Sequence, residues 1–516
     1  MVGLAGVALI AFGVRLFIGL HTSLDGDEAV EAITALRILR GHLVLMESDA
    51  HYLGALDSYL LAPFVAVFGT TLLAVRLCFS VVGAAYATAT YFLGTAIFRD
   101  RRSGLVMAAI SAVFPLFAIT FGIRARTYGV LLLIEALLLL LTARIGWGRE
   151  PAARRDWIWM GLLAGLAVWH DVLLAVPLAV CGLLLIGRAG VLGWSKLRSG
   201  FTTAAIAALI GFSPWIFYNA FTRLGSLRHL YTPLSTYSVP TLTAARQVLS
   251  AGLPIFVGAR VNFCGPETVP SWLVDVGLGL LAVAVLWLRR ASLQAAIRGR
   301  FTDLEPADWF LLIAPLAVVV VTVHWFNGLS CEPRYLMPLA VALVLAVTLL
   351  VIAARPWRAL GLALLAGCLL MSAITVSTQI SEHENLVVVP GAPQTKVDLA
   401  AAAAALESSH PHAVWAQYWL ARPIEFYSAD RFLVGAYGGY VGFPDLQTAV
   451  LQAPIPSWLF IEGDPEIAVF EAACQQRGIT FERSSPVRGL VYFDHLSGRV
   501  SPDDLGIRTQ TVSQAA

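Results

Sequence analysis

The stretch that decides the fold is residues 3–29, GLAGVALIAFGVRLFIGLHTSLDGDEA. Residues 3–20 are apolar except for Arg15. A run of about 20 apolar residues is long enough to cross the hydrocarbon core of a bilayer as a helix. Three carboxylates follow directly, at Asp25, Asp27 and Glu28. The stretch therefore predicts a membrane span that ends in an acidic loop.

The composition extends this prediction to most of the chain. Of the 516 residues, 58% are hydrophobic and 13% charged, whereas globular proteins average about 45–50% and about 25%. The formal net charge is only +2, and the six cysteines show no CxxC spacing. These values exclude a nucleic-acid partner and a disulfide scaffold. We predict an all-α polytopic membrane bundle whose main partner is the lipid bilayer.

Eleven spans are expected from the apolar runs. They cover approximately 3–20, 72–98, 103–123, 128–143, 157–169, 171–187, 201–219, 272–288, 308–326, 336–353 and 357–379. Five short arginine-rich loops fall at alternate connections, which places them in the cytoplasm by the positive-inside rule. The N-terminus is then cytoplasmic, and the long connections 21–71 and 220–271 face outward. We expect a multi-pass protein of the cytoplasmic (inner) membrane.

Three stretches allow a second interpretation. Tyr59–Phe68 is too short to span and contains Pro63, so we interpret it as an interfacial or re-entrant helix. The 157–187 run carries His170 and Asp171 at its centre, which favours a hairpin of two helices with these residues at its outer turn. Residues 3–20 could also be a signal peptide, but no A-x-A-like site follows.

The end of the chain differs in character from the rest. Residues 381–516 contain 15 Asp and Glu against 8 Lys and Arg. The predicted elements are helices at 396–407 and 465–477 and strands at 413–419, 458–462 and 490–493. We therefore divide the chain into a catalytic membrane domain, 1–380, with juxtamembrane helices in loop 21–71, a small extracytoplasmic α/β domain, 381–500, and a disordered tail, 501–516. The α/β domain is expected to help bind the acceptor.

Polar side chains gather in the predicted outer loops. Asp25, Asp27 and Glu28 have an ordinary interpretation, as the N-cap and acidic first turn of a helix. The alternative is a catalytic site, because a carboxylate can take a proton from an attacking hydroxyl or amine. A second group of polar and aromatic residues follows in the same loop, at His51, Tyr52, Asp57 and Tyr59, and the tyrosines are also suited to anchoring at the interface.

Arginines are unexpected on the outer side, and each needs a partner there. Arg124, Arg126 and Arg334 are suited to holding a phosphate through forked hydrogen bonds, or to buried ion pairs. Tyr335 is a weaker candidate for substrate contact. No phosphate-binding glycine loop or zinc spacing occurs. The carboxylates of the acidic loop could hold a divalent cation, Mg²⁺ or Mn²⁺, as a cofactor.

In these motifs the sequence resembles the polytopic GT-C glycosyltransferases, specifically the family 39-like branch related to protein mannosyltransferases and the lipid A aminoarabinose transferase. The resemblance rests on LDGDEA at 24–29, YLGALDSY at 52–59, PRYLMP at 333–338 and the order of the spans. Two features of relatives are missing: an aspartate near Arg124–Tyr128, and a lysine near Gly54.

The resemblance implies transfer of a sugar from a polyprenyl-phosphate donor to an envelope glycan, lipid or protein, with inversion, on the outer face of the membrane. It assigns the catalytic aspartate to Asp27, the acidic pair to Asp27 and Glu28, and a further acid to Asp57. The substrate-binding candidates are Asp25, His51, Tyr52, Asp57, Tyr59, His170, Asp171 and Tyr335. The alternatives are a transporter or flippase of lipid-linked sugars, a non-catalytic assembly subunit of the same fold, and a hydrolase.

Overall fold

A computed structural model describes residues 2–48, 50–148, 152–228, 241–260, 267–320, 322, 333–383, 386–389, 391–438 and 442–507. These residues are mostly helical and form two compact units, each with its own internal packing. The first, here called the membrane unit, comprises Met1–Ile18, Tyr52–Gly54 and Phe79–Gln379. The second, the loop unit, comprises Gly19–His51, Ala55–Cys78 and Ile380–Ala516. The loop unit thus contains most of the predicted first outer loop together with the C-terminal α/β segment.

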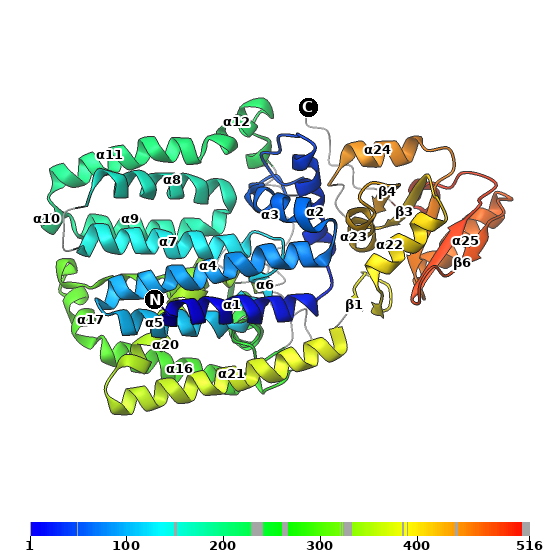
Figure 1. Ribbon diagram of the computed structural model, residues 1–516. Helices are drawn as coiled ribbons and strands as arrows, with labels where there is room; N and C mark the ends of the chain where they lie inside the picture. Colours follow the sequence, from blue (N-terminus) through cyan, green and yellow to red (C-terminus); the bar gives the residue numbers. More distant parts are fainter. Residues whose placement is uncertain are drawn as a thin grey trace. The chain divides into compact units, whose positions relative to one another are not determined.

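Helices make up most of the described part of the membrane unit, and the ends of three of them belong to the loop unit (Figure 1). They are α1 (Val2–Leu20), α4 (Leu72–Phe98), α5 (Arg101–Val113), α6 (Leu116–Gly122), α7 (Tyr128–Trp147), α8 (Arg154–His170), α9 (Ala175–Gly187), α10 (Ala189–Leu192), α11 (Trp194–Gly211), α12 (Ser213–Phe221), α14 (Thr241–Gln247), α15 (Leu253–Val257), α16 (Ser271–Leu288), α17 (Arg290–Ile297), α18 (Pro306–Leu311), α19 (Ile313–Val320), α20 (Leu339–Ile352) and α21 (Arg355–His383). The short turns η1 (Val172–Leu174) and η5 (Arg334–Leu336) lie among them.

Among the described residues, helix length and composition identify fewer than eleven helices that could each cross a membrane. Five of those described are long and apolar enough, or up to seven if each of two bent pairs is one span. The prediction of a polytopic helical protein is confirmed, and the count of eleven is not. Several predicted spans fall on helices of 10–17 residues. The predicted span at 308–326 corresponds to α18 and α19, and its last residues lie outside the described part of the chain.

One bent pair shows how a broken helix is accommodated. The predicted span 103–123 is two helices, α5 and α6, bent by 66° where Pro115 cannot continue the helix. Arg15, which is 1% exposed, donates hydrogen bonds to the carbonyls of Ala112 (3.0 Å) and Ser111 (3.3 Å) at the end of α5. A helix end buried away from water needs such partners. This explains the arginine within the first apolar run.

Helices α8 and α11 run side by side (Figure 1). Their contact depends on small residues, because a Cβ at Gly161 would lie 2.0 Å from the carbonyl oxygen of Ala204. A Cβ at Gly165 would lie 2.1 Å from that of Ala208. Gly161 and Gly165 have the GxxxG spacing that lets two membrane helices approach closely.

The loop unit begins with α2 (Gly26–Leu39) and α3 (Leu56–Phe68). The predicted short helix at 59–68 corresponds to α3, which begins three residues earlier and continues through Pro63. The same unit contains a five-stranded sheet in the order β4-β3-β5-β7-β6. Its strands are β3 (Ala413–Gln417), β4 (Leu433–Tyr437), β5 (Ser457–Ile461), β6 (Glu482–Ser484) and β7 (Leu490–Asp494), and β1 (Leu386–Val387) and β2 (Thr395–Lys396) pair separately. Strands β3, β4 and β5 are parallel, whereas β7 is antiparallel to both neighbours.

Helices α22 (Leu399–Ser408), α23 (Tyr418–Ser428), α24 (Pro444–Gln452) and α25 (Glu466–Gln476) connect these strands. The three predicted strands and two predicted helices of this segment all form. The strand expected at 413–419 ends at Gln417, because Tyr418 and Trp419 begin α23. The sequence analysis did not predict β4, which contains Gly435. A Cβ there would lie 2.5 Å from the ring of Trp415, so the neighbouring tryptophan occupies the side-chain space.

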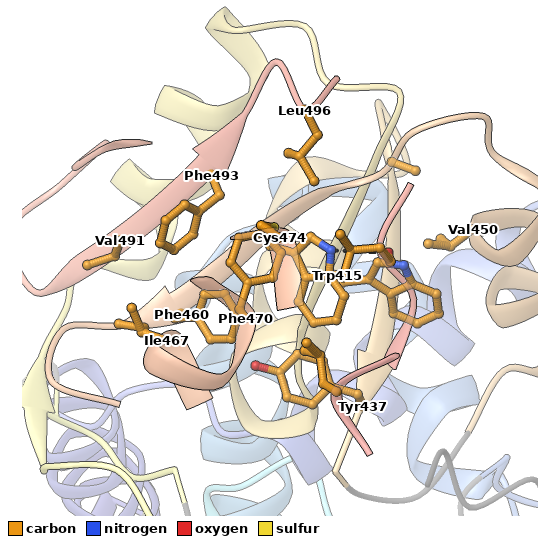
Figure 2. Packing of buried hydrophobic residues seen from close by; sticks show 14 of the residues in the cluster. Trp415, Tyr437, Val450, Phe460, Ile467, Phe470, Cys474, Val491, Phe493 and Leu496 are labelled. Atoms are coloured by element: carbon orange, nitrogen blue, oxygen red, sulfur yellow. Dashed lines mark hydrogen bonds between the residues drawn. The ribbon is translucent and has the colours of Figure 1, made fainter. Parts of the chain in front are cut away.

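Aromatic side chains fill the core of this sheet (Figure 2). Phe470 on α25 lies against Phe493 on β7 with ring centroids 4.7 Å apart, and Trp458 stacks on Phe460 at 5.7 Å. The core reaches beyond the expected end of the domain. Pro502–Leu505 form a short 3-10 helix, and Leu505 packs into the same core. The described chain is therefore ordered at 501–507, where a disordered tail was expected, and 508–516 lie outside the described residues.

Candidate functional site

The acidic turn after the first apolar run forms the N-terminus of α2. Asp25 is the N-cap, and its side chain accepts a hydrogen bond from the backbone N–H of Glu28 at 2.9 Å. Glu28 Oε2 accepts in return from the N–H of Asp25 at 3.3 Å. These reciprocal bonds form a capping box. Asp25 and Glu28 therefore cap α2, as the first interpretation of the acidic turn predicted. Asp27 is not part of the capping box.

Glu28 has a second partner at the start of α4. It is 1% exposed, and both of its carboxylate oxygens accept from the guanidinium of Arg76, which is fully buried. Arg76 also donates to the backbone carbonyls of Gly19 (3.1 Å), Thr22 (3.2 Å) and Ser23 (3.2 Å). Arg76 thus ties the end of α1 to the start of α2. The sequence analysis did not select Arg76 as a site residue.

Asp27, like Asp25, is a partly exposed carboxylate of this turn, whereas Glu28 is buried. The Oδ1 atom of Asp27 accepts a hydrogen bond from the hydroxyl of Tyr418, at 3.0 Å. Tyr418 follows β3 and is 1% exposed. A carboxylate that is held by a buried phenol and remains partly exposed is suited to meeting a substrate. No local sequence signal identifies Tyr418, because 391 positions separate it from Asp27.

A buried hydrogen-bond network connects α2 with α3. The hydroxyl of Ser58 lies 2.7 Å from Glu31 Oε2 and 2.9 Å from Glu47 Oε1, and all three side chains are fully buried. Asp57, in the first turn of α3, is also fully buried. Glu47 and Ser58 were not site candidates. The acid expected to be functional at Asp57 is therefore part of a buried region, whereas His51 and Tyr59 are partly exposed.

A separate polar cluster lies within the membrane unit. The hydroxyl of Thr127 donates to Asp171 Oδ2 at 2.8 Å, and Leu173 N–H donates to Asp171 Oδ1 at 2.9 Å. His170 Nε2 donates to the carbonyl of Thr127 at 3.0 Å. Arg126 and Arg334 both interact electrostatically with Asp171. Three segments far apart in the sequence, around 126, 171 and 334, therefore meet at this cluster.

Two further candidates in the membrane unit lie against aromatic rings. The guanidinium carbon of Arg124 is 4.3 Å from the ring centroid of Phe121, and that of Arg334 is 5.2 Å from the ring of Tyr335. Such contacts are favourable cation–π interactions. Tyr52 is partly exposed, and it precedes Gly54, whose N–H donates to the carbonyl of His170 at 3.1 Å.

The predicted site residues thus divide between the two units, and each group is described within its own unit. The loop unit contains Asp25, Asp27, Glu28, His51, Asp57 and Tyr59; the membrane unit contains Tyr52, Arg124, Arg126, His170, Asp171, Arg334 and Tyr335. Among the described residues, no group of three or more His, Cys, Asp or Glu could hold a metal ion. We therefore assign no step to the Mg²⁺ or Mn²⁺ that the acidic loop left open.

The fold is similar to that of solved GT-C glycosyltransferases, which confirms the resemblance inferred from the sequence at the level of the fold alone. ArnT from Cupriavidus metallidurans bound to undecaprenyl phosphate matches with a TM-score of 0.59 and 13% identity, over 95% of this chain and 97% of that chain. The apo state of ArnT matches with a TM-score of 0.61 and 12% identity, over 95% and 96%.

A third solved structure is an Archaeoglobus fulgidus oligosaccharyltransferase tethered to an acceptor peptide containing the NVT sequon. It has 13% identity and a TM-score of 0.47, over 95% of this chain and 73% of that chain. No family model and no curated protein matches the sequence.

Proposed function

We propose that the protein is a glycosyltransferase of the cytoplasmic (inner) membrane. It moves a sugar from a polyprenyl-phosphate donor to an envelope glycan, lipid or protein on the outer face. The observation that carries the proposal is Asp27, a partly exposed carboxylate on a capped helix that is held by a buried tyrosine. The fold shared with ArnT, which was crystallised with undecaprenyl phosphate, supports a lipid-phosphate donor.

In the proposed reaction Asp27 is the general base. Its carboxylate takes the proton of an acceptor hydroxyl or amine while that atom attacks the anomeric carbon of the sugar. The bond between the anomeric carbon and the phosphate oxygen breaks, and its electron pair leaves with the oxygen as polyprenyl phosphate. A single displacement of this kind inverts the anomeric centre.

Glu28 is assigned a supporting role, because both of its carboxylate oxygens are engaged by Arg76. Arg126 and Arg334 are our candidates for contacting the donor phosphate, since forked guanidinium donors stabilise the charge that develops there. Both arginines interact electrostatically with Asp171, which places them in the same region of the membrane unit. Arg124, His170, Tyr52 and Tyr335 remain secondary candidates for substrate binding.

The test is release of polyprenyl phosphate from a panel of polyprenyl-phosphate sugars by the purified full chain. A membrane and cell-wall extract supplies the acceptor. We expect Asp27→Asn to lower the rate about 10²–10⁴-fold, the usual contribution of a general base. Asp445→Asn is the matched control, because it removes an exposed carboxylate of the same unit.

The outcomes separate the alternatives. Release that needs both the extract and Asp27 supports transfer, and release without extract indicates hydrolysis. If the wild type binds the lipids but releases nothing across the panel, a transporter or a non-catalytic subunit replaces the proposed function. If Asp27→Asn and Asp445→Asn behave alike, Asp27 is not the base.

A further inference from the structure

The turn from β3 to α23 occupies a special place in the sheet of the loop unit. Strand β3 lies between the parallel strands β4 and β5, and the chain leaves it through α23 toward β4. In open α/β sheets, functional residues collect at the carboxyl ends of strands, where successive connections leave to opposite sides. Tyr418 is the first residue after β3. The sheet topology thus places this tyrosine at a position that commonly serves a site.

Close packing fixes the orientation of the Tyr418 ring. The ring is buried and lies edge-on to Trp419, with centroids 5.1 Å apart and planes at 88°. Both rings lie against Gly26 on α2, where a Cβ would come within 2.9 Å of Tyr418 Cε1 and 3.0 Å of Trp419 Cε3. Only glycine permits this approach without displacing a ring. The phenol hydroxyl is therefore aimed at Asp27 by packing as well as by its hydrogen bond.

The helix that carries Tyr418 is itself firmly anchored. At its start, Gln417 Oε1 accepts from the N–H of Trp419 at 2.8 Å. Within it, Arg422 donates a hydrogen bond to Glu425, and both side chains are fully buried. The ring of Phe443 then lies against Arg422 of α23 (5.2 Å) and against Arg37 of α2 (4.4 Å). Helices α2 and α23 thus both contact Phe443. The position of Asp27 on α2 therefore depends on the C-terminal segment.

Two ion pairs join the far end of α2 to the same segment. Arg37 pairs with Asp445 at 2.6 Å, and Arg40 pairs with Asp430. The pairs are partly exposed, and each is expected to contribute less than about 1 kcal/mol. They are further contacts between α2 and the C-terminal segment.

We infer that Tyr418 is a positioning residue for Asp27, and that the C-terminal α/β segment thereby takes part in the reaction. The inference rests on the proposed function of Asp27. A hydrogen bond from a phenol to a carboxylate is a charge-assisted bond, which is stronger and more directional than a neutral one. It holds the Asp27 carboxylate in one rotamer, so the base is oriented before the acceptor arrives. Misplacement of a reacting group by about 1 Å can cost 10²-fold in rate.

The experiment measures kcat and KM for the donor with the full-length protein, as release of polyprenyl phosphate. Tyr418→Phe removes only the hydroxyl, and we expect kcat to fall about 10–100-fold while KM changes less than about twofold. Tyr492→Phe is the matched control, because it removes another buried phenol hydroxyl from the same sheet. We expect it to retain kcat within about twofold.

A second pair of variants tests the same contact without changing the tyrosine. Gly26→Ala forces the Tyr418 and Trp419 rings to move, so its kcat should fall as in Tyr418→Phe. Gly367→Ala is its control, since a Cβ there meets nothing within 4 Å. A melting curve of each variant shows whether it is folded. If Tyr418→Phe does not fold, the comparison of Gly26→Ala with Gly367→Ala decides.

The outcomes distinguish this inference from the proposed function. Wild-type kcat in folded Tyr418→Phe, an effect on KM alone, or an equal loss in Tyr492→Phe overturns the positioning role while Asp27 remains the base. If the wild type releases nothing, or if Asp27→Asn is fully active, the proposed function fails and the inference fails with it.

Discussion

Breaking the buried pair of Glu28 and Arg76 should strongly destabilise the loop unit. The exposed fractions of the two side chains are 1% and 0%. Removing one partner from such a pair leaves an uncompensated buried charge and typically costs about 3–5 kcal/mol. We therefore expect Glu28→Gln to be strongly destabilising, because arginine cannot lose its proton to escape the penalty.

The loss can be expressed as a melting temperature. For a domain of about 150–250 residues, 1 kcal/mol corresponds to about 2–4 °C. Glu28→Gln should then lower the melting temperature of the purified full chain by about 6–20 °C, as followed by tryptophan fluorescence. The double variant Glu28→Gln/Arg76→Met should lose less than the two single variants together, because it removes both charges. It should not recover fully, since Arg76 also serves three backbone carbonyls.

The matched control is a pair in the same unit that faces solvent. Arg37 and Asp445 are 23% and 64% exposed, and Asp445→Asn should cost less than about 1 kcal/mol. Burial acts to raise the pKa of Asp445, but the hydrogen bond and charge of Arg37 outweigh it, so that the pKa is lowered. If Glu28→Gln melts no lower than Asp445→Asn, the reasoning from burial is refuted.

Three further outcomes are expected. Burial raises the pKa of Glu425 to about 7, against the opposing charge of Arg422, so the folded state favours the neutral acid. The resulting stabilisation is full below the ordinary pKa of 4.5 and is lost as the pH rises through 7. The unfolding free energy should fall by up to about 3 kcal/mol over this range, and Glu425→Gln should abolish that slope in a melting series. Ser58→Ala removes the hydroxyl between Glu31 and Glu47 and should cost about 1–3 kcal/mol; chemical denaturation that shows no change would contradict the network. Gly54→Ala would place a Cβ 2.6 Å from the carbonyl oxygen of Trp169 and should cost about 1–3 kcal/mol, whereas Gly182→Ala, with nothing within 4 Å, should melt like the wild type.

The sequence was most informative where the cause of the structure is local. The N-cap role of Asp25, at the start of α2, was one of the two interpretations that the sequence offered, because a cap depends on residues three positions apart. The alternation of buried strands and amphipathic helices likewise predicted β3, β5, β7, α22 and α25. Local patterns did not predict β4, because glycine is uncommon within strands. Gly435 is suited to this strand because the ring of Trp415 occupies the space of a side chain there.

The membrane spans show the limit of predicting helices from the length of apolar runs alone. The apolar runs correctly predicted a polytopic helical protein, because hydrophobic length is a property of consecutive residues. Their division into helices depends on Pro115 and on the contacts of the broken ends, such as Arg15 with the carbonyls of α5. A run of suitable length can therefore form two short helices, and the count of eleven spans is not confirmed.

The sequence by itself determined that this is a membrane protein with an acidic turn after its first apolar run, because composition and spacing are written in consecutive residues. Only the tertiary structure decided which of those acids is buried in an ion pair and which is held by a tyrosine. Arg76 lies 48 positions from Glu28, and Tyr418 lies 391 from Asp27. No periodicity encodes such pairs, because hydrogen bonds depend on distances in space that folding alone creates.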